Sequence, residues 1–111
     1  SVEQGSEAYN YIFETAARMY PTDEIANLNA ANAAMQQGAY DNAASYLVNA
    51  GDGADAIYAR GVLAGLRGDY EEALGYLRQA ARLKVAPAVD AINQINEVLN
   101  FTARMHGAAN N

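Results

Sequence analysis

The stretch GDYEEALGYLRQA, residues 68–80, decides the fold of this chain. A related stretch, GAYDNAASYLVNA, occupies residues 38–50, thirty residues earlier. Glycine, tyrosine, alanine, tyrosine, leucine and alanine stand at the same offsets in both copies. A sequence that repeats at a period of this size is typical of stacked supersecondary units, in which each unit buries its apolar face against the next.

The composition fits one small, alanine-rich domain. The 111 residues suffice for a modest core, and hydrophobic residues make up 51% of them. Alanine supplies much of that share, which predicts closely approaching helices instead of bulky core side chains. The net charge of −6 and the single lysine, Lys84, argue against nucleic acid or an anionic membrane as a partner, because both require basic surfaces.

Three further features of the sequence limit what the chain can be. It contains no cysteine, so it has neither disulfides nor thiolate chemistry. No apolar run approaches the roughly 20 residues of a membrane span. Because the chain begins at Ser1 and not at methionine, we expect it to be a piece of a longer protein, with any targeting signal upstream.

Apolar residues at helical spacing, with turn residues between them, predict six helices and no strand. The first is expected to run from Ser6, its N-cap, to about Tyr20, and the second to follow Thr22 as its cap and to end at Gly38 in a left-handed conformation. The predicted apolar faces of these two helices are Tyr9, Ile12, Phe13 and Ala16, and Ile25, Leu28, Ala31 and Met35. The other four helices are expected from Asp41, as a cap, to about Ala50, over 54–67, from Asp69 or Tyr70 to about Lys84, and from Pro87 until the helix fades at 105–107, with 108–111 disordered.

These turns and helices resemble the tetratricopeptide repeat family, whose unit is a pair of antiparallel helices. The matching positions are Gly38, Tyr40, Ala43, Leu47 and Ala50 in one unit, Gly68, Tyr70, Ala73, Leu77 and Ala80 in the next, Gly61 at the small position, and Phe13, Ala16 and Pro21 for the closing half of a preceding unit. The resemblance implies an all-α fold, a right-handed α-α superhelix of about six helices in antiparallel pairs. It divides the single domain 1–111 into a half repeat at 6–21, repeats at 22–52 and 53–86, and a C-terminal capping helix at 87–105.

The sequence also departs from the family pattern. The spacing of thirty residues is shorter than the family's unit of about 34, so the link at 51–53 is expected to have lost about one helical turn. Asn27 and Ile57 replace the aromatic residue of the first helix, Ala31 takes its small position, and Arg60 stands where leucine is usual. These changes bear on the superhelical geometry more than on the stacking of helix pairs.

A second resemblance concerns the N-terminal part. The run YIFETAARMYPTD, residues 11–23, and the run ANLNAANAAM, residues 26–35, are similar to helical-repeat segments of envelope-associated proteins from gut Bacteroidetes. That resemblance implies an accessory domain of a longer bacterial protein in the periplasm or cell envelope.

The sequence offers little for catalysis, and we expect no enzyme activity, cofactor or metal. The only histidine, His106, lies in the expected tail, where a solvated side chain is the simpler interpretation. Asp52 and Asp55 lack the ligand spacing of a calcium loop and are expected to cap helices. Glu71 and Glu72 favour a helix N-terminus through the helix dipole.

A binding surface is the stronger hypothesis. In a stack of helix pairs, the first helix of each pair lines a concave face, which by the repeat register holds the candidate protein- or peptide-binding residues Asn32, Met35, Gln36, Tyr58, Val62, Asn93 and Asn96, with Leu28, Val89 and Ile92. Carboxamides can bond both the donor and the acceptor of a peptide backbone. The alternative is that the asparagines are merely solvated and the apolar members belong to the core.

The sequence therefore predicts a non-catalytic helical-repeat module that binds a protein or peptide as an accessory part of a larger protein. The alternative function is a structural spacer or a self-association module. In that case the sixth helix, with Ile92, Ile95 and Leu99, would be the cap or the face of a weak homodimer.

Overall fold

The computed structural model describes the backbone of residues 2–110 and the side chains of residues 10–107. Over these residues the chain forms six α-helices and no strand, which confirms the all-α prediction. The helices are α1 (Val2–Met19), α2 (Glu24–Gln36), α3 (Tyr40–Val48), α4 (Ala54–Leu66), α5 (Tyr70–Arg82) and α6 (Pro87–Asn110).

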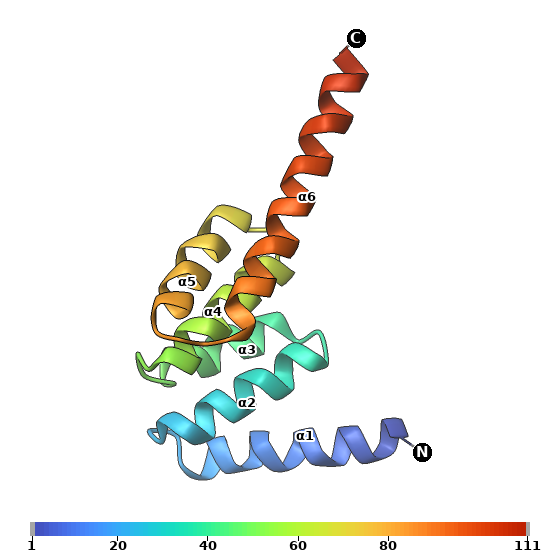
Figure 1. Ribbon diagram of the computed structural model, residues 1–111. Helices are drawn as coiled ribbons and strands as arrows, with labels where there is room; N and C mark the ends of the chain where they lie inside the picture. The colour runs from blue at the N-terminus through green and yellow to red at the C-terminus, as the bar shows by residue number, and fades with distance from the viewer. Residues whose placement is uncertain (1, 111) are drawn as a thin grey trace.

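Consecutive helices pack against each other, and α4 lies at the centre of the arrangement (Figure 1). Besides its sequence neighbours α3 and α5, α4 contacts both α2 and α6. The C-terminal half of α6 extends beyond the other helices (Figure 1). The radius of gyration is 16.0 Å, against about 13 Å expected for a compact domain of this length, so the molecule is elongated.

The helix N-termini differ from the predicted ones at three places. Asp23, not Thr22, caps α2, and its side chain accepts a hydrogen bond of 2.8 Å from the backbone N–H of Ala26. Asp41 lies in the first turn of α3 and does not cap it, because the helix already begins at Tyr40. Ser6 lies inside α1, which begins at Val2, so it is not an N-cap either.

The helix α6 is longer than predicted. It continues through Gly107 to Asn110, so the expected fading at 105–107 and the disorder over 108–110 are wrong, and Asn111 lies outside the described residues. One glycine costs a helix only about 1 kcal/mol relative to alanine, which the neighbouring helix formers Arg104 and Met105 offset in part.

Three helices end in the same way. The backbone N–H of Ala39, Asp69 and Val85 donates to the carbonyl five residues earlier, at 2.9, 2.9 and 3.0 Å respectively. This bond requires a left-handed residue just before the donor. Gly38 and Gly68 supply it with φ of 75° and 82°, as predicted for Gly38, whereas at the end of α5 the residue is Lys84, with φ of 70°.

The core is built from alanine, as the composition predicts. Seven alanines are completely buried: Ala30, Ala31, Ala34, Ala43, Ala73, Ala80 and Ala88. Leu77 is the largest side chain that is buried to the same extent, at 1% exposed. Short side chains at the contacts allow the helices to approach closely, which leaves little room for large side chains between them.

The closest approach joins α4 and α5 at Gly61. A Cβ atom placed on Gly61 would lie 2.8 Å from Leu77 Cγ, closer than real Cβ contacts, and 3.2 Å from Tyr76 Cβ, a tight contact. A side chain at this position therefore displaces the Leu77 side chain or moves α5 away from α4. Thirty residues earlier, Ala31 takes the corresponding place in α2 and is also completely buried.

Two predicted apolar faces are wrong in part. Ile12 and Ile25, assigned to the inner faces of the first two helices, are 62% and 72% exposed. In α1 the buried residues among those described are Asn10 and Ala17, and Tyr9 lies outside the described side chains. In α2 the buried face consists of Asn27, Ala30, Ala31, Ala33 and Ala34. Small residues occupy these buried positions because the helices approach each other closely. Hydrophobicity alone does not predict which residues lie at such close contacts.

Asn27, at a position where the resembled repeat pattern has an aromatic residue, has a structural role of its own. Its side chain is buried, and Nδ2 donates to the carbonyls of Pro21 at 3.0 Å and of Asp23 at 2.8 Å. Both acceptors belong to the turn between α1 and α2. A buried carboxamide thus fixes this turn. By contrast, the corresponding residue of α4, Ile57, packs in an apolar cluster with Ala80 and Ala88.

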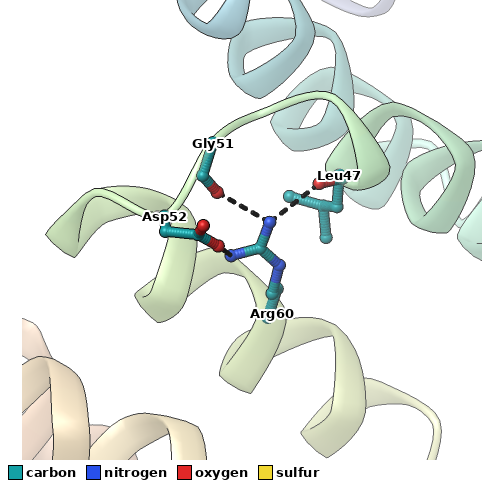
Figure 2. A network of polar contacts seen from close by, with 4 residues as sticks. All are labelled: Leu47, Gly51, Asp52 and Arg60. Atoms are coloured by element: carbon teal, nitrogen blue, oxygen red, sulfur yellow. Dashed lines mark hydrogen bonds and ion pairs between the residues drawn. The ribbon is translucent and has the colours of Figure 1, made fainter.

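Arg60 likewise has a role that explains its departure from leucine (Figure 2). Its Nη2 donates to the carbonyls of Leu47 at 2.9 Å and Gly51 at 2.7 Å, and Nη1 lies 3.5 Å from Asp52 Oδ1. The helix α3 has 9 residues and α5 has 13, so the lost helical turn is missing from the end of α3. The guanidinium donates hydrogen bonds to carbonyls at and after this early helix end. A cation at the C-terminus of a helix also interacts favourably with the helix dipole.

Candidate functional site

A groove runs between α2 and α4, and we call it the α2–α4 groove. Its volume is about 630 Å³. The lining residues are Leu28, Asn29, Asn32, Met35 and Gln36 from α2, and Asp55, Tyr58, Val62 and Leu66 from α4. Residues three and four apart on a helix share one face, so the two facing stripes follow directly from the contact between α2 and α4.

The two walls of this groove differ in chemistry. On α2, the exposed carboxamides of Asn32 and Gln36 flank the half-buried Met35. On α4, half-buried Tyr58 and Val62 form an apolar strip. Carboxamides offer donors and acceptors to a polypeptide backbone, and the strip opposite offers contact to apolar side chains. The acidic Asp55, in the first turn of α4, lies at one end of the strip.

A second groove, the α4–α6 groove, lies on the other side of the same α4 residues. Its volume is about 540 Å³. It shares Tyr58, Val62 and Leu66 with the α2–α4 groove and adds Gly61, Gly65, Tyr70 and Leu77 from α4 and α5, and Pro87, Asp90, Ala91, Gln94, Ile95 and Val98 from α6. The α4 side chains thus form a ridge with a groove on either side.

The structure brings five of the seven predicted binding residues together in the α2–α4 groove: Asn32, Met35, Gln36, Tyr58 and Val62. The predicted neighbour Leu28 lines it as well. The other two, Asn93 and Asn96, line neither groove described here. Of the accompanying α6 residues, Val89 is 53% exposed, and Ile92 packs against the core between α4, α5 and α6.

The two predicted α6 residues lie away from the groove-lining face of that helix. The helix α4 begins 30 residues after α2, but α6 begins 33 residues after α4. Asn96 stands two positions beyond Gln94, which lines the α4–α6 groove. Two residues rotate a side chain by about 200° around a helix, which moves it to the opposite face.

Three residues of the α2–α4 groove were not predicted: Asn29, Asp55 and Leu66. Asp52 and Asp55 were expected to cap helices, but the N-cap of α4 is Gly53 with no side-chain cap hydrogen bond, and Asp55 lies in the first turn of the helix. The spacing of Asp55, Tyr58, Val62 and Leu66 by three and four residues could have placed them on one face of α4.

No family model matches the chain, and no curated protein matches it. Among the described residues, no three side chains of histidine, cysteine, aspartate or glutamate cluster as metal ligands would. None of the helices in residues 2–110 combines the length and the apolar character needed to span a membrane.

Proposed function

We propose that this chain is a tetratricopeptide-like stack of helix pairs, with α2–α3 and α4–α5 as its two units, α1 as a preceding half unit and α6 as the capping helix. In such a right-handed superhelix the first helices of successive pairs contact one another. The contacts of α4 with α2 and with α6 support this assignment. The glycines in a left-handed conformation after α2 and α4, Gly38 and Gly68, support it as well, because equivalent helices then end on the same residue type, whereas α5 ends on Lys84.

We further propose that the module binds an extended segment of a partner protein in the α2–α4 groove and performs no catalysis. The observation that carries this proposal is the groove itself, where carboxamides face an apolar strip of tyrosine and valine. An extended strand presents backbone groups at its edge and alternating side chains, which this pair of walls matches. Asp55 and the net charge of −6 favour a neutral or basic segment over an acidic one.

On the resemblance of its N-terminal part, we place the module in a larger protein of the bacterial envelope. With two units the groove is short, so one module alone binds weakly and gains affinity from other parts of the complex. Attachment to a longer chain would supply the additional contacts that a groove this short needs.

The test is a selection of peptides from a displayed random library on the purified chain, followed by titration of the selected peptides. The double variant Asn32→Ala with Tyr58→Ala changes both walls of the α2–α4 groove. Its matched control is Asn93→Ala, an exposed α6 residue outside both grooves. We expect the double variant to lose about tenfold or more in affinity and the control to bind normally. Equal binding by both variants, or no peptide above background, would exclude the groove as a binding site.

A further inference from the structure

The projecting part of α6 carries an exposed apolar stripe. Val98, Phe101 and Met105 are 42%, 58% and 55% exposed. They are spaced by three and four residues, as in the seam of a coiled coil. The stripe begins in the α4–α6 groove, which Gln94 and Val98 line, and continues along the half of α6 that extends beyond the other helices (Figure 1).

This stripe is not the face that the sequence predicted for self-association. Ile95 is buried, and Ile92 and Leu99 pack with it against the core between α4, α5 and α6. Those three residues hold α6 on the domain and are not available to a second molecule. Of the two roles predicted for these residues, cap or homodimer face, this packing matches the cap, and the exposed stripe lies on another side of the helix.

Charged residues flank the exposed stripe in a pattern that selects a partner. Glu97 and Arg104 are both exposed, and each directly precedes a residue of the seam, Val98 and Met105. They therefore lie on the same flank of the seam, one heptad apart, with opposite charges. When two copies of such a helix pack antiparallel, the same flanks of the two helices face each other. Glu97 of each copy then faces Arg104 of the other, and two ion pairs form.

We propose that a second copy of this chain packs on the stripe through an antiparallel pairing of the two α6 helices. The proposal commits to this arrangement because a parallel pairing opposes Glu97 to the uncharged Thr102 and forms no ion pair. In the antiparallel register set by the charges, Val98 lies opposite the partner subunit's Phe101. The partner subunit's Met105 lies opposite Gln94, at the edge of the α4–α6 groove.

The groove thus receives the projecting half of the partner's helix, and the contact is reciprocal. This arrangement is the isologous kind that closes on two subunits. The ridge of Tyr58, Val62 and Leu66 is common to both grooves, but the α2 wall of the α2–α4 groove takes no part in it. The inference therefore stands independently of the proposed peptide binding, and either can fail while the other holds.

The first test measures the mass of the full chain by sedimentation equilibrium over a concentration series up to about 1 mM, where weak dimers become populated. We expect a monomer–dimer equilibrium. Phe101→Glu should raise the dissociation constant by about tenfold or more. Asn100→Glu adds the same charge next to the stripe but off its seam, and it should have a much smaller effect. Neither exposed residue contributes to the core, so folding is unaffected. A monomer at every concentration, or a dimer that Phe101→Glu leaves intact, would overturn the proposal.

The second test exchanges the charges. Glu97→Arg alone and Arg104→Glu alone each place like charges opposite each other and should weaken the dimer several-fold at low salt. The combined variant restores both ion pairs with their signs reversed, and its dissociation constant should return close to that of the unaltered chain. A combined variant as weak as the sum of the single changes would contradict the antiparallel pairing.

Discussion

The two helix pairs, α2–α3 and α4–α5, are built on one pattern but are stabilised differently. In α4–α5 both helices have 13 residues, and they approach each other without any side chain at Gly61, against Leu77. In α2–α3 the second helix has only 9 residues. Its end is held by Arg60, which reaches across from the next pair (Figure 2).

The shorter α3 is compatible with the pair because the carbonyls near its end find a donor outside the helix, Arg60. In α5 the chain continues as a helix past the position that corresponds to Gly51, so no such donor is needed. By its place in the helix, the residue of α6 that corresponds to Arg60 is Asn93, an exposed carboxamide. One pair is therefore stabilised mainly by apolar packing and the other partly by polar contacts at its end.

The largest effect should come from the apolar centre of each pair. Leu77→Ala should cost about 3–5 kcal/mol of the free energy of unfolding, and Leu47→Ala about 2–3 kcal/mol, because the latter side chain is slightly less buried. Urea denaturation followed by circular dichroism measures both. A Leu47→Ala cost equal to or above that of Leu77→Ala would show that the two pairs do not differ in packing.

Gly61→Ala should destabilise the chain by about 2 kcal/mol, although alanine is the better helix former, since the new methyl group clashes with Leu77. The control is Gly75→Ala in α5, at an exposed position where nothing lies within 4 Å of the new Cβ. It should stabilise by about 1 kcal/mol. The same urea titration gives both, and a stabilising Gly61→Ala would contradict the close approach.

Arg60→Leu, which restores the residue usual in the repeat pattern, should cost about 1–2 kcal/mol, because two carbonyls lose a charged donor. Hydrogen exchange should show the loss locally, as faster exchange at the end of α3 and unchanged exchange in α5. Uniform acceleration in both helices would mean that Arg60 does not act on the end of α3.

Lys84→Gly should stabilise by about 1 kcal/mol, because a residue with a Cβ is strained at a φ of 70°. Gly68→Ala, at the equivalent end of α4, should destabilise by a similar amount of about 1 kcal/mol. Thermal denaturation of the two variants measures both shifts of the unfolding midpoint. Shifts in the same direction would contradict the predicted strain at Lys84.

The smallest effect is expected for the ion pair between Asp41 on α3 and Arg67 at the end of α4. The Asp41 side chain is fully exposed, so water and salt screen the pair. Asp41→Ala should leave the unfolding midpoint within experimental error. A clear loss of stability would mean that this surface contact between the two pairs matters more than its exposure suggests.

Much of the fold could be predicted from the sequence, because its signals are local. Turn glycines such as Gly38, and alanines such as Ala43 and Ala73, mark helix ends and close contacts within a few residues. The functions of Asn27 and Arg60 could not be predicted in this way, since their partners depend on how the neighbouring turn is placed in space.

In the candidate site, too, some residues follow from local sequence signals and others depend on how the helices are placed in space. The predicted residues on α2 and α4 line one groove, and these two helices begin thirty residues apart, the spacing of the duplicated stretches. Those on α6 line neither groove, because the longer α5 shifts the start of the next helix. The left-handed conformation of Lys84 could not be predicted, because nothing in the sequence distinguishes this lysine from one in an ordinary conformation.

Direct contact between Gly61 and Leu77 sets the distance between α4 and α5. A double-mutant cycle of Gly61→Ala and Leu77→Ala, measured by urea denaturation, tests this contact. We predict that Gly61→Ala destabilises the unaltered chain but costs much less in the Leu77→Ala background, because the Leu77 atoms at 2.8 and 2.9 Å are gone and only the approach of Tyr76 Cβ at 3.2 Å remains. The same destabilisation in both backgrounds would contradict the account.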